Sequence, residues 1–137
     1  MNLVEQLLRA DTKNAEERET GVFLSKRLQK ILKADEPVQV TIRELNPRRV
    51  NDIVDYQTKK DGSVDMKKVY DASLMMCVEG CVEPDLADKD MQEHFGCASA
   101  KDLAEKLFRA EAGDIAKAIS ELSGAGDEGT QEDEIKN

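Results

Sequence analysis

The second half of the chain, residues 74–124, constrains the fold most, because it divides into short helical patterns with their own start and stop signals. Residues 72–78, just before Glu79-Gly80, contain one strongly polar side chain, that of Ser73. A helix that is apolar nearly all round is typically enclosed by other helices. Aromatic residues make up only 4% of the chain and tryptophan is absent, so aliphatic and methionine side chains must build the core. These features predict a compact bundle of short helices around one central buried helix.

Helix punctuation in this half is regular. Asp88 is placed to cap a short helix that ends at Gly96, and Ser99 begins the next helix as the first residue of a capping box. The pair Gly113-Asp114 is expected to separate that helix from the last one, which Gly124 ends. The apolar residues at helical spacing are predicted to face the core: Met91, Phe95, Leu103, Leu107, Phe108, Ile115, Ala118, Ile119 and Leu122.

The first half contains one clear strand pattern. Val38, Val40 and Ile42 alternate with polar residues and place three β-branched side chains on one face. A single strand cannot satisfy its own backbone, so it requires a partner. The nearby candidate lies at residues 22–24, although residues 22–32 also fit a helix. We therefore expect a mainly α (α+β) fold with a small antiparallel hairpin that turns at residues 34–37.

A helix is predicted to follow this hairpin. Asn46 is placed as its N-cap and Pro47 as its first residue, which are positions that these residue types favour. Asp61-Gly62 marks the turn after it, and Asp65 is placed to cap the central helix. The predicted buried stripe of this helix consists of Val50, Ile53 and Val54.

The chain is expected to have three parts. Residues 1–20 form an amphipathic helix and a polar linker, residues 21–124 form a single globular domain, and residues 125–137 form a disordered acidic tail. The opening helix can be held away from the domain or can fold back onto it, and the sequence leaves both arrangements open. Its apolar face, Leu3, Leu7 and Leu8, is the predicted partner-binding element, either in a groove or against a partner helix.

Charge and cysteine content limit the classes of function. The chain has 29 acidic and 20 basic residues, a net charge of −9, which disfavours binding to nucleic acid and to anionic membrane surfaces. No segment approaches the ~20 apolar residues of a membrane span, and the amino terminus lacks the pattern of a secretory signal. An odd count of three cysteines fits a reduced intracellular protein. The acidic surface suits a protein partner, but solubility alone is the plainer interpretation.

The one chemical alternative is a zinc site. Cys77, Cys81, His94 and Cys97 are a permissible ligand set, and the first two share one helical face. The spacing C-x3-C…H-x2-C lacks the usual C-x2-C knuckle, and Cys77 lies in an apolar run where cysteine typically packs as a small hydrophobe. We therefore weigh a zinc-stabilised interaction module against a protein without metal, and we favour the latter. No catalytic residue, nucleophile motif or cofactor motif is evident.

The order of these motifs resembles the XkdN-like phage tail assembly chaperones, which occur in tailed bacteriophages and defective prophages. The points of similarity are SKRL at residues 25–28, VTIREL at 40–45 and the series VEG…PDL…DK…M…FG at 78–96. DLAEKLF at 102–108 and GDIAKAISELSG at 113–124 complete the series. Each motif is ordinary helix and turn chemistry, but their joint order extends over nearly the whole chain to Gly124.

This resemblance implies a non-enzymatic assembly factor of the host bacterial cytoplasm. Members of such a family bind the tape measure protein, a very long helical polypeptide that sets tail length, and keep it soluble. They help tail tube subunits polymerise around it and are absent from the finished virion. The tape measure protein is thus the expected partner, tail tube subunits are a second candidate, and self-association is compatible with the sequence. The resemblance assigns no metal and no cofactor.

Overall fold

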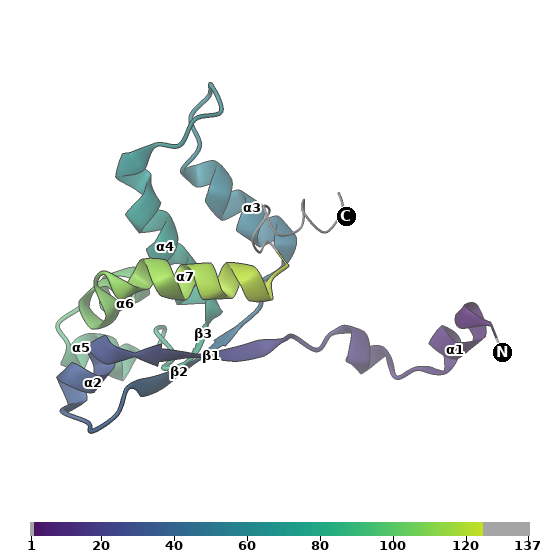
Figure 1. Ribbon diagram of the computed structural model, residues 1–137, viewed down its shortest axis with the longest axis horizontal. Helices are drawn as coiled ribbons and strands as arrows, with labels where there is room; N and C mark the ends of the chain where they lie inside the picture. The colour runs from purple at the N-terminus through teal and green to yellow at the C-terminus, as the bar shows by residue number, and fades with distance from the viewer. Residues whose placement is uncertain (1, 125–137) are drawn as a thin grey trace.

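The computed structural model describes residues 2–124, and in that part it contains seven α-helices, a short 3-10 helix and three β-strands (Figure 1). The expected mainly helical α+β fold is confirmed. A helical body surrounds the small sheet, and an N-terminal arm extends away from it. The arm consists of α1 (Leu3–Arg9) and the 3-10 helix Thr12–Ala15. The predicted acidic tail, residues 125–137, lies outside the described residues.

The sheet contains the predicted antiparallel pair and one further strand. Strand β1 (Thr20–Ser25) pairs with β2 (Val38–Arg43), and β2 pairs with β3 (Cys81–Glu83), in the order β1-β2-β3. The pairing of residues 22–24 with the Val38–Arg43 strand is thus confirmed. The sequence gives no sign of β3, because three residues are too few to show an alternating pattern.

The connection between β1 and β2 differs from the expected tight turn. Helix α2 (Lys26–Leu32) intervenes between the strands, so the ambiguous residues 22–32 are partly strand and partly helix. The change occurs at Ser25, whose Oγ accepts the N–H of Leu28 at 2.9 Å as an N-cap. The turn at residues 34–37 therefore returns the chain from α2 to β2.

Glu111, at the start of α7 (Glu111–Leu122), fixes α2 to the body. Its carboxylate accepts the N–H groups of Lys26 at 2.9 Å and Arg27 at 3.3 Å, and the Ser25 hydroxyl donates to it at 2.6 Å. A carboxylate at a helix N-terminus is stabilising because the N–H groups there have no partner within the helix. One side chain thus joins β1, α2 and α7.

The central helix of the core is α4 (Met66–Gly80), as predicted. It packs mainly against α7, and also against α6 (Ala100–Phe108) and α3 (Pro47–Tyr56). Its buried residues are Ala72, Leu74, Met76, Cys77 and Gly80. Gly80 has no side chain where it faces Ile119 of α7, and a Cβ there would lie within 2.8 Å of the Ile119 Cγ2 atom. The two longest helices of the body therefore approach closely at this point.

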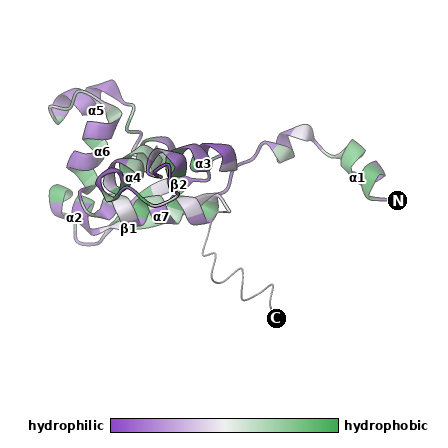
Figure 2. Ribbon diagram, turned by 90° about the horizontal axis from the view of Figure 1, so that it is seen from above, coloured by the Kyte–Doolittle hydropathy of each residue, from purple (hydrophilic) through white to green (hydrophobic). Residues whose placement is uncertain are grey.

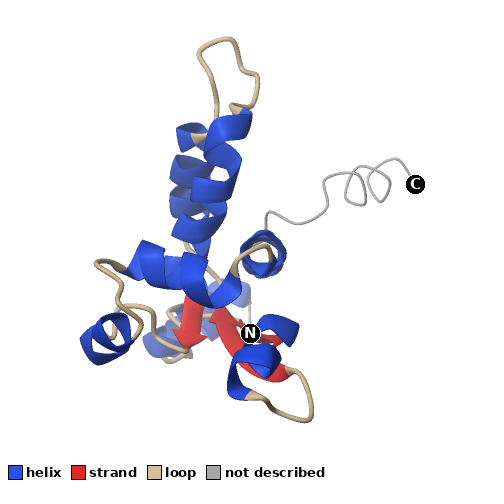
Figure 3. Ribbon diagram, turned by 90° about the vertical axis from the view of Figure 1, so that its left-hand side faces the viewer, coloured by secondary structure: helices blue, strands red, loops and turns tan. Residues whose placement is uncertain are grey.

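Helices α3 and α4 form a hairpin that projects away from the sheet, with residues 57–65 as the loop at its tip (Figure 3). The base of the hairpin is held by an ion pair in which Arg49 donates to Glu79 at 2.7 Å. The predicted caps Asn46 and Asp65 are confirmed, since each accepts a backbone N–H of its helix. Val54 is an exception to the predicted buried stripe, because it remains 45% exposed.

The predicted helix boundaries of the second half are mostly confirmed. Asp88 caps α5 (Lys89–His94), Gly96 follows it with a φ of 69°, and Ser99 caps α6. The expected break at Gly113-Asp114 is wrong, because α7 begins at Glu111 and continues through both residues. The chain turns instead at Arg109, whose φ of 50° is a conformation that glycine adopts far more easily. Nothing in the local sequence predicts that the chain turns at this arginine.

Candidate partner-binding surfaces

The predicted interaction element, α1, is apolar and exposed. Asn2 begins the helix, and its side chain accepts the N–H of Glu5 at 2.8 Å. The helix buries none of its residues, and Leu3, Leu7 and Leu8 are 66%, 64% and 81% exposed. In Figure 2 the arm stands clear of the body with α1 coloured as hydrophobic. Of the two arrangements left open by the sequence, the structure has the helix held away from the body.

A seven-residue helix without tertiary contacts is marginal in water, because its few backbone hydrogen bonds do not offset the cost of nucleation. The linker after α1, residues 10–19, is exposed throughout and contains no large apolar side chain. The residues that follow α1 in the sequence therefore offer no apolar side chains against which its aliphatic side chains could pack. A helix of this kind is typical of segments that gain stability by binding a partner.

A second surface, which sequence analysis missed, is an open groove between α4 and α6. It has a volume of about 1140 Å³. Its lining includes the small residues Ser73, Ala98 and Gly113, together with exposed charged residues of α6. The remaining residues that line it are Met66, Val69, Tyr70, Gly96, Cys97, Asp102, Glu105, Lys106, Arg109 and Ala110.

Two polar side chains of this groove, Tyr70 and Lys106, form hydrogen bonds that hold the fold. The Tyr70 hydroxyl donates to the carbonyl of Arg109 at 2.9 Å, and the Lys106 ammonium donates to the carbonyl of Phe95 at 2.8 Å. Partial burial, followed by the nearby charge of Glu105, raises the pKa of Tyr70, so its hydroxyl stays protonated and remains a donor. The first of these bonds supports the unusual backbone of Arg109. Both bonds therefore stabilise the walls of the groove.

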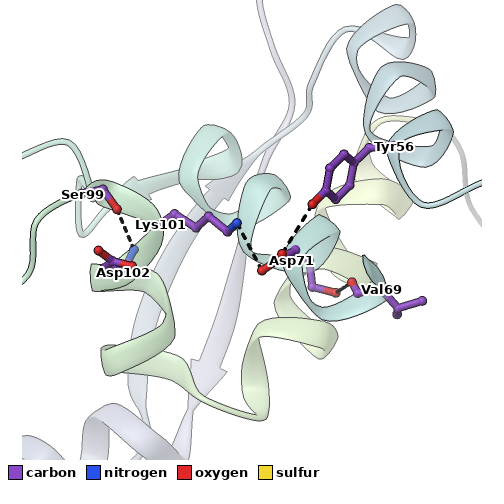
Figure 4. Close-up of polar contacts among 7 residues, drawn as sticks. Tyr56, Val69, Asp71, Ser99, Lys101 and Asp102 are labelled. Carbon is purple, nitrogen blue, oxygen red and sulfur yellow. Dashed lines mark hydrogen bonds and ion pairs between the residues drawn. The ribbon is translucent and has the colours of Figure 1, made fainter. Parts of the chain in front are cut away.

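Beside the groove, Asp71 connects three helices (Figure 4). Its carboxylate pairs with Lys101 of α6 at 3.2 Å and accepts the hydroxyl of Tyr56 of α3 at 3.4 Å. The same view shows Ser99 accepting the N–H of Asp102 at the start of α6. About 40% of each side chain in the Asp71–Lys101 pair is exposed, so this ion pair contributes little stability and mainly orients the helices.

The four candidate zinc ligands do not form a site. Cys77 is buried in α4, its thiol donates to the carbonyl of Ala112 at 3.5 Å, and hydrogen bonding to Cys81 together with burial raises its pKa far above the ordinary range. His94 stacks edge-on against Phe95, with ring centroids 5.0 Å apart. Within residues 2–124 no three His, Cys, Asp or Glu side chains are grouped as metal ligands. The zinc alternative therefore lacks the geometry that it requires, because its cysteines serve in packing.

The apolar face of the arm is visible in the sequence because it lies within seven consecutive residues. The groove is not visible in the sequence, because its lining residues come from three separate segments, at 66–73, 96–98 and 102–113. The alternation of small and apolar residues within α4 gave no sign of which face would stay open. Only the packing of α6 against α4 decides that.

These features define a small α+β protein with an exposed apolar arm and an open groove. No helix among the described residues is long and apolar enough to cross a membrane. The family model for phage XkdN-like tail assembly chaperone proteins matches residues 4–136, which is nearly the whole chain. The chain belongs to this family of tail assembly chaperones. No curated protein and no solved structure matches it.

Proposed function

We propose that this chaperone binds the tape measure protein of its phage, keeps that long helical polypeptide soluble, and assists assembly of the tail tube around it. The observation that carries the proposal is the exposed aliphatic face of α1 in a member of a tail assembly chaperone family. A long polypeptide with apolar stripes aggregates unless those stripes are covered. An apolar helix on an otherwise acidic protein provides such a cover and adds charge to the complex.

Leu3, Leu7 and Leu8 are the proposed contact residues. They occupy one side of α1 at helical spacing, so they match an apolar groove or an apolar stripe on a client helix. Because α1 buries none of its residues, the exposed surface of these side chains is available to the client. The client in turn supplies the packing that a seven-residue helix lacks on its own.

We assign separate roles to the parts of the chain. Residues 1–20 act as the binding arm and its linker, and residues 21–124 act as the folded body that carries the arm. The protein acts in the host cytoplasm during assembly, is absent from the finished virion, and uses no cofactor and no catalytic step. Tail tube subunits are a second partner, brought to the client by the same complex.

Co-expression with the tape measure protein tests this function. The chaperone is expected to raise the soluble fraction of the client and to co-purify with it, while tail tube subunits are added in a parallel experiment. A matched co-expression with an unrelated acidic protein of similar size controls for a general effect on solubility. If the client stays insoluble and no complex is isolated, the proposed function is wrong.

A further inference from the structure

We propose that the free edge of β1 is a dimerisation surface, at which two copies of this chain pair their β1 strands antiparallel and join two three-stranded sheets into one. Within the described residues, 2–124, strand β1 lies at the edge of the sheet and pairs with β2 alone. An uncovered strand edge presents unpaired backbone donors and acceptors to any other strand. The inference concerns the chain alone and does not depend on the identity of its client.

The backbone direction of β1 follows from its first residues. Just before the strand, the carbonyl of Glu19 accepts the N–H of Glu44 at 2.8 Å, and the N–H of Glu19 donates to the Glu44 side chain at 2.9 Å. Both groups of Glu19 thus point toward β2. Because this direction alternates along an antiparallel strand, the N–H and C=O groups of Thr20, Val22 and Leu24 point to the open edge.

This edge lacks the devices that usually block strand addition. The strand TGVFLS contains no proline and no charged residue, and its register with β2 is continuous over all six residues without a bulge. Val22 and Leu24 are each 56% exposed on the face of the sheet that points away from the core. Natural proteins normally protect an edge of this length, so its open state indicates an interface.

A second copy is the occupant that fits this edge, because the strand is complementary to itself. With the twofold axis at Val22, this residue pairs with the partner's Val22, and Thr20 pairs with the partner's Leu24. The exposed aliphatic side chains then meet on the outer face. On the inner face, Gly21 lies opposite the partner's Phe23, next to a hollow of about 320 Å³ that Ala118 and Leu122 help to line.

Charge complementarity supports the antiparallel direction. Residues 16–19, just before β1, are three glutamates and Arg18 and carry a net charge of −2, whereas the residues after it, Lys26 and Arg27, are basic. Antiparallel pairing places the acidic start of one strand beside the basic end of the other. No like charges lie opposite each other within the strands, since β1 itself is uncharged.

Sedimentation tests the dimer, because it measures the mass of the full chain in solution over a range of concentrations. Wild type is expected to shift from monomer to dimer as its concentration rises. Val22→Lys places two positive charges across the twofold axis and should weaken the dimer by about tenfold or more. The matched control is Val54→Lys, a valine of similar exposure on α3, which should dimerise as wild type does.

A cross-link tests the register without relying on a destabilising change. Two residues in a hydrogen-bonded antiparallel pair have Cα atoms about 5.5 Å apart, which suits a disulfide. Val22→Cys should therefore give a disulfide-linked dimer under mild oxidation, while Val54→Cys and wild type should not. A wild-type chain that stays monomeric at every concentration, an unweakened Val22→Lys dimer, or a Val22→Cys chain that does not cross-link would overturn the proposal.

Discussion

Replacing Leu3, Leu7 and Leu8 together with serine should abolish client binding while leaving the fold intact. Their exposed fractions of 66%, 64% and 81% together amount to about two complete leucine side chains. Burying that much apolar surface against a client is worth about 5 kcal/mol, at about 2.5 kcal/mol for each fully buried leucine. The loss corresponds to a dissociation constant that rises by about a thousandfold or more.

Binding of the purified chain to immobilised tape measure protein measures this effect. The control is Leu32→Ser on α2, a leucine that is 65% exposed but lies on the body and outside the arm. It removes similar apolar surface and should leave the affinity for the client within about threefold of wild type, as expected for a change outside the interface. Thermal unfolding of both variants reports on the fold in the same samples.

Two results would refute the reasoning. If the triple variant binds the client as tightly as wild type, the arm is not the contact surface. If its free energy of unfolding falls by clearly more than about 0.5 kcal/mol, the arm packs on the body and its exposure is not available to a client. The second result would also contradict the absence of buried residues in α1.

Three substitutions probe the body through urea unfolding. Glu111→Gln should lower the free energy of unfolding by about 2 kcal/mol, because the charged acceptor at the start of α2 is lost; an unchanged value would mean that water replaces it. Gly80→Ala should cost about 2 kcal/mol through overlap with Ile119, and the same change should cost little in an Ile119→Ala background. Arg109→Gly should raise the free energy of unfolding by about 1 kcal/mol, because glycine adopts the positive φ at this position without the strain that arginine has there; a decrease would contradict strain at Arg109.

Local chemistry was sufficient to predict the helices and most of their ends. Asn46, Asp65, Asp88 and Ser99 each cap a helix as expected, because a cap depends on a side chain and on N–H groups two or three residues away. The apolar stretch at residues 72–78 likewise indicated the central helix by itself. The arm was found for the same reason, since its apolar face is contained in seven residues.

Features that depend on distant residues were missed or misplaced. Strand β3 forms because residues 81–83 pair with β2, and three residues alone show no strand pattern in the sequence. The helix break expected at Gly113 is instead a turn at Arg109, whose carbonyl accepts a hydrogen bond from the Tyr70 hydroxyl of another helix. Cys77 and Cys81 suggested a metal site by their spacing, but both are buried in the core and serve as packing residues.

The sequence by itself determined the helical α+β class, the central helix, the apolar face of the opening helix and, through the order of its motifs, the family. These properties follow from hydrogen bonds and apolar spacing within one or two helical turns. The tertiary structure alone decided which surfaces stay open: the groove between α4 and α6, and the free edge of β1. Such surfaces depend on which elements cover one another, and that is set by contacts between residues far apart in the chain.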